Sequence, residues 1–399
     1  MKKEYVDPKN VKLVVFVISL VLLGFLIGDK QDSIKKLVQS PQSFFQQSEN
    51  VSASNLAKML ANKNFTFINV HTPYEGEIEK TDTSIPYDQI VASEKNLPKD
   101  KNTPIVLYCK SGRMSTEAMV TVKKLGYTNV RHLAGGMDAW TASGKKLADL
   151  SQLAEEVLPK AGFELPIAWG DIGPQLVTLG VIDLEKFKKT VQPTEDQLSI
   201  LVKGSTENIR IDATNSQFVV DVLWALGLAQ KSIVYEEGPM GKENKKDVGN
   251  FASTGGWNLG KGDAVKYLSK FDLISLTTDQ QKKVGEIAQN VYRPCCGNST
   301  WFPDCNHGMA ALAAIELMVA AGINEDAIYK NVLKLNSFWF PDSYLAVAAY
   351  FARQGTSWDN VDAKTVLGKT YSSGQGATLI QQKVGEIPGR PKSAGGCGA

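Results

Sequence analysis

The sequence predicts an α/β domain with a mostly parallel sheet, followed by a mainly α-helical domain. Two observations support this architecture. Short apolar runs alternate with helical patterns over residues 53–146, as in sheets whose two faces are covered by helices. Helical periodicity then dominates residues 150–385, where strand signals are few and short. A third observation, an uncharged apolar stretch near the N-terminus, predicts a membrane anchor.

Composition limits the possible functions. Hydrophobic residues make up 43% of the 399 residues and charged residues 22%, which is typical of packed globular domains. The 44 basic and 42 acidic residues leave a net charge of +2 without a basic run, so we expect no nucleic-acid partner. Five cysteines are too few for a disulfide scaffold, and their odd number leaves at least one thiol unpaired within the chain.

Residues 11–28 are predicted to form a transmembrane signal anchor, after a flank at 1–10 and before a polar linker at 29–52. The segment is near the lower length limit for spanning a bilayer, and no small-residue cleavage pattern follows it. A buried soluble helix is the alternative. Flanking lysines slightly favour an N-terminus inside, which predicts a single-pass membrane protein with extracytoplasmic domains.

The domain at 53–146 places one cysteine at a typical ligand-binding position. We expect strands at 65–70, 104–108 and 129–133 and helices at 53–59 and 115–125. Cys109 directly follows the second strand, at the carboxyl edge where such sheets bind ligands. The loop from Cys109 to Ser115 then enters a helix, whose N-terminal N–H groups stabilise anions and favour a thiolate. Lys110 and Arg113 add positive charge.

The loop Cys-Lys-Ser-Gly-Arg-Met-Ser resembles the active-site loop of the rhodanese family. The resemblance extends over about 95 residues, with INVHTPYEGEI (68–78), Ile85-Pro86 and LAGGMDAW (133–140) in the family's order. It implies a sulfurtransferase in which Cys109 forms a persulfide. The donor would be a small sulfur-containing anion such as thiosulfate, the acceptor a small thiol or a protein thiol, and no cofactor would be required. The residues implied to bind substrate are Lys110, Ser111, Gly112, Arg113, Met114 and Ser115.

Two departures from the family pattern put the substrate in question. Asn69-Val70-His71 stands where many members carry Asp-x-Arg, and Arg113 lies four rather than five places after the cysteine. A cysteine phosphatase would need arginine six places after the nucleophile, where this chain has Ser115. We interpret His132 as a packed core residue, and Glu75 and Glu77 as solvated loop charges.

The mainly helical domain at 150–385 carries a second dense signal. Cys295, Cys296, Cys305 and His307 fall within 13 residues between two predicted helices. Three sulfurs and an imidazole could bind zinc, iron or copper, or a haem. One alternative is a redox-active or sulfur-accepting thiol pair. The other is a structural disulfide or buried cysteines that cap the helix.

These possibilities define an alternative function. The chain would be a metal- or haem-binding envelope protein in which the rhodanese-like part serves as a sulfur-binding module. The tail at 386–399 is rich in glycine, proline and serine, and we expect it to be disordered. Helices of the second domain are predicted at 195–202, 216–228, 277–292, 309–321, 325–335 and 344–351.

Overall fold

The structure, a computed structural model, describes residues 48–385 and 387. The described residues from Asn50 onward form one compact unit. The predicted flank (1–10), anchor (11–28) and most of the linker (29–52) lie outside the described residues, as does the predicted disordered tail (386–399) apart from Ile387. The proposed division into domains at 53–146 and 150–385 stays a prediction.

The localisation predicted from the sequence requires correction. Among the described residues, no helix combines the length and the apolar character needed to cross a bilayer. This finding contradicts the prediction of a single-pass membrane protein with extracytoplasmic domains. The apolar run at 11–28, on which that prediction rested, lies outside the described residues.

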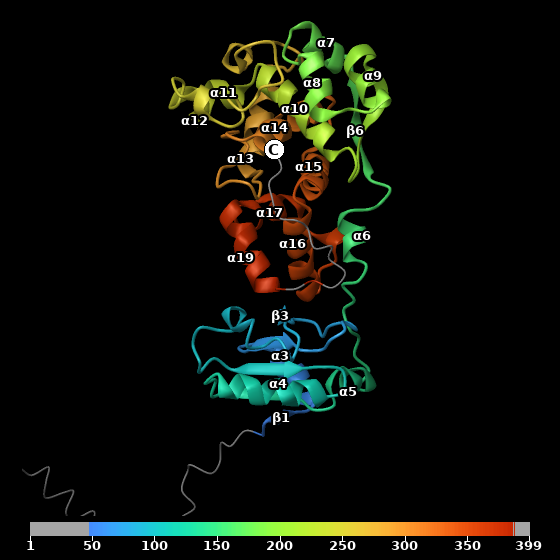
Figure 1. The fold of residues 1–399 in the computed structure, drawn as a ribbon, viewed down its shortest axis with the longest axis vertical. Coiled ribbons are helices and arrows are strands. Elements are labelled where there is room, and N and C mark those ends of the chain that lie inside the picture. Colours follow the sequence, from blue (N-terminus) through green and yellow to red (C-terminus); the bar gives the residue numbers. More distant parts are fainter. Residues whose placement is uncertain (1–47, 386, 388–399) are drawn as a thin grey trace, which may run out of the picture. The chain divides into compact units, whose positions relative to one another are not determined.

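Residues 50–133 contain the strands of a five-stranded parallel sheet (Figure 1). Its spatial order is β1-β5-β4-β2-β3, and every neighbouring pair is parallel. The parallel arrangement confirms the predicted α/β class and brings the carboxyl ends of all strands to one edge. The strands are β1 (Asn50–Val51), β2 (Thr66–Asn69), β3 (Thr83–Ser84), β4 (Ile105–Tyr108) and β5 (Val130–Leu133).

Side-chain alternation along β4 divides the core into two layers. Ile105 and Leu107 belong to the cluster on the face covered by α4 (Arg113–Lys124). Val106 and Tyr108 belong to the cluster on the opposite face, covered by α3 (Ala53–Ala61) and α5 (Gly136–Ala142). Both faces of β4 are therefore buried, which explains its continuous apolar sequence. The next residue of the alternation, Cys109, belongs to the α4 layer.

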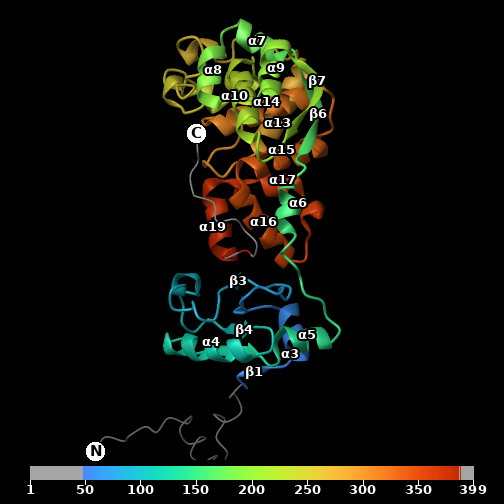
Figure 2. The ribbon, with the colours of Figure 1, turned by 45° about the vertical axis from the view of Figure 1, so that its right-hand side comes forward.

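The remaining described chain is mainly helical (Figure 2). Its buried apolar side chains form one hydrophobic core. Helix α10 is buried along nearly its whole length and packs against α14, which is also almost entirely buried. All six predicted helices are present, with boundaries shifted by up to four residues at their starts and ends. The helices are α6 (Leu153–Val157), α7 (Ile172–Thr178), α8 (Leu184–Val191), α9 (Glu195–Lys203), α10 (Ser216–Ala229), α11 (Ile233–Glu237), α12 (Pro239–Lys242), α13 (Thr278–Asn290), α14 (Asn306–Ala320), α15 (Glu325–Trp339), α16 (Pro341–Arg353), α17 (Ala363–Leu367), α18 (Lys369–Ser372) and α19 (Gly374–Val384).

A two-stranded antiparallel sheet in this region was not predicted. Strands β6 (Phe163–Gly170) and β7 (Ser205–Ile211) pair with register shifts between residues 164 and 170. Leu165, Ile167 and Trp169 alternate inward, which is the period-two pattern of a half-buried strand. Pro166 occupies an outward position of that pattern. Its presence argues against a strand in the sequence, because proline cannot donate to the ladder.

A buried ion pair connects segments far apart in sequence. Glu77, after β2, accepts two hydrogen bonds from Arg353 at the end of α16, each 2.7 Å. Both side chains are almost fully buried, at 0% and 2% exposure, and Arg353 also donates to the carbonyl of Val384 at 2.7 Å. The interpretation of Glu77 as a solvated loop charge was therefore wrong.

We expect Glu77→Gln to destabilise the protein by about 3–5 kcal/mol, because it leaves the Arg353 charge buried without a counter-charge. Glu94→Gln is the matched control, since it breaks the exposed pair with Lys101, worth at most about 1 kcal/mol. The measurement is the urea midpoint of each variant. Equal midpoint shifts would contradict the structural role of the buried pair.

Candidate functional site

The loop that follows β4 is held in place by the start of α5. The amide of Met137 donates to the carbonyl of Cys109 at 2.9 Å, and the amide of Asp138 donates to the carbonyl of Lys110 at 3.0 Å. Gly136 makes this approach possible: its φ is +57°, and a Cβ there would lie 2.1 Å from the Cys109 carbonyl oxygen. Gly136, the second glycine of Leu-Ala-Gly-Gly-Met, thus permits a backbone clamp on the cysteine loop.

Two backbone N–H groups donate hydrogen bonds to the Cys109 sulfur. The amide of Gly112 donates to Sγ at 3.1 Å, and the amide of Ser115, in the first turn of α4, donates at 3.4 Å. Cys109 is only 1% exposed, so these donors act where water is largely excluded. Such an arrangement stabilises negative charge on the sulfur. Gly112 takes φ +100° to enter the helix, which a residue with a Cβ rarely adopts.

A hydrogen-bonded chain of side chains leads away from this sulfur. The Ser115 hydroxyl lies 3.6 Å from Sγ of Cys109 and 3.1 Å from Nδ1 of His132. Nε2 of His132 lies 2.7 Å from the side-chain oxygen of Asn50. His132 is therefore more than the packed core residue expected from the sequence. Its position in β5, which pairs with the strand that Cys109 directly follows, is the signal that could have revealed it.

Acidic partners reduce the positive charge predicted for the loop. Lys110 pairs with Glu75, and Arg113 pairs with Glu117 at 2.7 Å. These side chains are 40–61% exposed, so each pair is weak and screened by salt. The main anion-stabilising groups facing the sulfur are therefore backbone N–H groups. Glu75 is exposed, as expected of a solvated loop charge, and it is also the partner of Lys110.

Asn69, which stands where many family members carry the Asp of Asp-x-Arg, has a local structural role. The side-chain oxygen of Asn69 accepts from the amide of His71 at 3.0 Å, and its amide group donates to the carbonyl of Gly76 at 3.1 Å. Asn69 thus fixes the turn after β2 with two neutral hydrogen bonds. No charge partner is needed for this role, which explains how the turn forms without the acidic residue.

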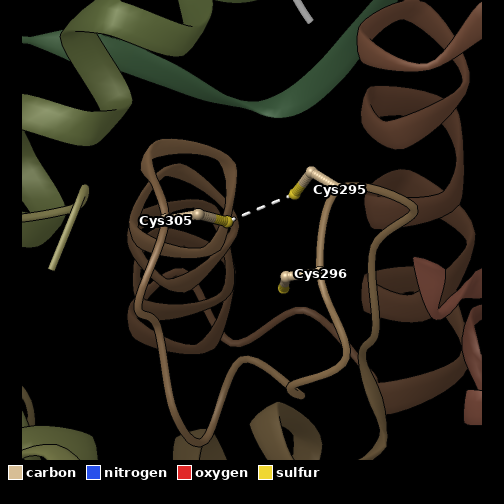
Figure 3. Close-up of side chains that lie close together, drawn as sticks. All are labelled: Cys295, Cys296 and Cys305. Atoms are coloured by element: carbon tan, nitrogen blue, oxygen red, sulfur yellow. Dashed lines mark hydrogen bonds between the residues drawn. The ribbon is translucent and has the colours of Figure 1, made fainter.

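Three of the four residues in the second predicted site come together. Figure 3 shows Cys305, at the start of α14, and Cys295 pointing toward one another, with Cys296 next to Cys295 on the same loop. Sγ of Cys295 and Sγ of Cys305 are 3.3 Å apart, and all three sulfurs lie within 4.8 Å of one another. Hydrogen bonds from Cys295 and Cys296, and the adjacent Arg293 guanidinium, hold the pKa of Cys305 well below its ordinary value.

His307 does not join the sulfurs, although the sequence analysis included it as a ligand. Its ring packs 4.4 Å from the ring of Phe340 and 5.8 Å from that of Trp339, measured between centroids. Burial lowers the pKa of His307 to about 4, so the ring is neutral at physiological pH. In the described part of the chain, the group that converges here consists of three thiols alone.

Comparisons with known proteins cover the region that contains this loop. The family profile described as "Rhodanese-like domain" matches residues 52–143. A sulfurtransferase from Allochromatium vinosum is 30% identical over 98 residues, which cover 24% of this chain and 89% of that protein. The chain belongs to the rhodanese-like family. The resemblance seen in the sequence is thereby confirmed.

Other relatives of this rhodanese-like protein share a smaller part of their length. The probable adenylyltransferase/sulfurtransferase MoeZ of Mycobacterium tuberculosis is 39% identical over 82 residues, and the match spans 20% of each chain. A rhodanese-related protein from Thermoplasma volcanium is similar in structure with 25% identity, covering 25% of this chain and 95% of that chain, at a TM-score of 0.22. The chain therefore spans about a fifth of the length of MoeZ.

We expect Gly136→Ala to disrupt the Cys109 loop, because its Cβ would overlap the Cys109 carbonyl. Gly144→Ala is the matched control: Gly144 also has positive φ, but a Cβ there meets nothing within 4 Å. The control should cost about 1–2 kcal/mol from backbone strain alone, and Gly136→Ala clearly more. Urea midpoints measure the loss of stability, and the alkylation rate of Cys109 measures the disruption of its loop. Equal behaviour of the variants would contradict the clamp.

Proposed function

We propose that this chain is a sulfurtransferase that carries sulfane sulfur as a persulfide on Cys109. The observation that carries the proposal is the buried Cys109 sulfur, with N–H donors from Gly112 and Ser115 at 3.1 and 3.4 Å. A nucleophilic cysteine requires stabilisation of its thiolate, and this loop supplies it from backbone groups fixed by folding. Membership of the rhodanese-like family and the sulfurtransferase relatives support the same chemistry.

The reaction divides into two balanced steps. The Cys109 thiolate attacks the outer sulfur of a donor such as thiosulfate, a new S–S bond forms, and sulfite leaves with the electron pair of the broken S–S bond. An acceptor thiolate then attacks the outer sulfur of the Cys109 persulfide, takes that sulfur, and releases the Cys109 thiolate. The same N–H groups stabilise the sulfur anion before and after each step. This cycle requires no cofactor.

Partner classes follow from this cycle. The donor is a small sulfane-sulfur compound and the acceptor is a small thiol or a protein thiol. Because Lys110 and Arg113 are paired with carboxylates, the loop offers less free positive charge than its sequence suggests. A persulfide donor of lower charge is thus as compatible with the loop as thiosulfate.

The hydrogen-bonded side chains of Cys109, Ser115 and His132 provide a route for the thiol proton. Because the Asn50 oxygen accepts from Nε2 of His132, Nδ1 of the neutral ring is the acceptor for the Ser115 hydroxyl. Transfer of the thiol proton to Ser115, and of the hydroxyl proton to Nδ1, would leave a Cys109 thiolate and a His132 imidazolium. The hydroxyl would then donate to the sulfur anion. We propose Ser115 and His132 as positioning residues that activate Cys109 in this way.

We expect the full chain to form thiocyanate from thiosulfate and cyanide, and Cys109→Ser to lose this activity, because its hydroxyl forms no persulfide. The assay is repeated with glutathione persulfide as donor, so that a donor preference is not mistaken for inactivity. Matching circular dichroism spectra and urea midpoints establish that Cys109→Ser is folded. Undiminished activity in this variant, or inactivity of the intact chain with both donors, would contradict the proposal.

For the proton route, we expect Ser115→Ala and His132→Gln each to slow persulfide formation about 10-fold or more and to shift its pH profile. Thr116→Val is the matched control. The Thr116 hydroxyl donates to the Gly112 carbonyl at 2.9 Å, a bond that the Ser115 hydroxyl can also make. Thr116 is not part of the proposed proton route from Cys109 to His132. The double variant should be no slower than either single one, since both act through one route. A pH profile unchanged in His132→Gln would refute the route.

A further inference from the structure

A second concentration of chemically active side chains lies apart in sequence from the Cys109 loop. Cys295 and Cys296 lie on the loop after α13, and Cys305 is the N-cap residue of α14. Residues from two segments thus bring three thiols within 4.8 Å of one another (Figure 3). The sulfurtransferase mechanism uses none of them.

The surroundings of these sulfurs are polar and rigidly organised. Arg293 is completely buried and donates from Nε to Sγ of Cys305 at 3.1 Å. The rest of its guanidinium group is held by Asp304 at 3.0 Å and by the carbonyl of Asn298 at 3.2 Å. Gly308 leaves the space for this group, because a Cβ there would lie 2.4 Å from Nη2 of Arg293.

The Cys305 sulfur accepts hydrogen bonds from N–H groups, as metal-bound thiolates do. Besides Arg293, the amide of Gly308 donates to Sγ of Cys305 at 3.4 Å. Hydrogen bonds of this kind orient thiolate ligands and spread their negative charge. A divalent ion with three thiolates carries one net negative charge, which the N-terminus of α14 and the Arg293 donor stabilise.

Distances between the sulfurs are close to those that a small ion requires. A metal–sulfur bond of about 2.3 Å places ligand sulfurs about 3.8–4.0 Å apart. The sulfurs of Cys295 and Cys305 are 3.3 Å apart, and the whole group spans no more than 4.8 Å. Shifts of less than about 1 Å would therefore bring the three sulfurs around one ion.

We propose that Cys295, Cys296 and Cys305 form a three-thiolate site for a soft, thiophilic metal ion of the zinc(II) or copper(I) class. Sulfur-only donors favour these ions over magnesium or calcium, which require oxygen ligands. A dithiol pair would account for Cys295 and Cys305 but leaves the convergence of Cys296 unexplained. His307 is not a ligand, since its ring is packed against Phe340 and Trp339.

The test uses the full chain, reduced and kept under argon. Zinc(II) is titrated in competition with a chromophoric chelator, and copper(I) in competition with bicinchoninate, so that the two arms identify the preferred ion. We expect about one ion per chain and a first shell of three sulfurs by X-ray absorption. Cys295→Ser, Cys296→Ser and Cys305→Ser should each abolish tight binding. Serine at 305 retains a helix-capping oxygen, so that variant should keep its fold.

Cys109→Ser is the matched control, because it removes a buried thiol outside the cluster and should leave binding unchanged. Undiminished binding in Cys305→Ser, or a first shell dominated by nitrogen and oxygen, would overturn the proposal. So would a reduced chain that binds neither ion, including one that forms a Cys295–Cys305 disulfide in air. The thiocyanate assay on the same preparations reports separately on Cys109, so failure of one proposal is distinguishable from failure of the other.

Discussion

The geometry of the candidate active site depends on one close backbone approach, that of Gly136 to the carbonyls of Cys109 and Lys110. This contact lets the amides of Met137 and Asp138 hold the loop after β4 at 2.9 and 3.0 Å. Because these two hydrogen bonds fix the carbonyls of Cys109 and Lys110, the N–H groups of the loop point at the Cys109 sulfur. The electrostatic stabilisation needed for sulfur chemistry is therefore built during folding, without reorganisation when charge develops.

Two sulfur sites of different character result from the same physical rule. Each places a cysteine sulfur near a helix N-terminus and supplies N–H donors to it. At Cys109 the donors are backbone amides, and one sulfur is left to react. At Cys305 the donors include a buried arginine, and two further sulfurs lie within 4.8 Å. The number of sulfurs, rather than the donors, separates the persulfide chemistry proposed for the first site from the metal binding proposed for the second.

Local constraints explain what the sequence revealed. The position of Cys109 after an apolar strand, and the glycines that follow the next strand, are encoded within short segments, so fold class and loop were predictable. The Glu77–Arg353 pair joins residues 276 positions apart, and nothing near Glu77 signals a buried partner. Likewise, the contact of His132 with Ser115 depends on the pairing of β4 with β5. The His307 ring looked like a ligand in sequence, but aromatic packing on α15 and at its C-cap directs it elsewhere.

The most direct test of the central claim is intact and peptide mass spectrometry of the full chain after brief exposure to a sulfane-sulfur donor. The account predicts one added sulfur atom, located on Cys109, which is removed by an acceptor thiol and does not form in Cys109→Ser. Added sulfur found only on Cys295, Cys296 or Cys305, or its persistence in Cys109→Ser, would contradict the assignment of sulfur transfer to the loop after β4.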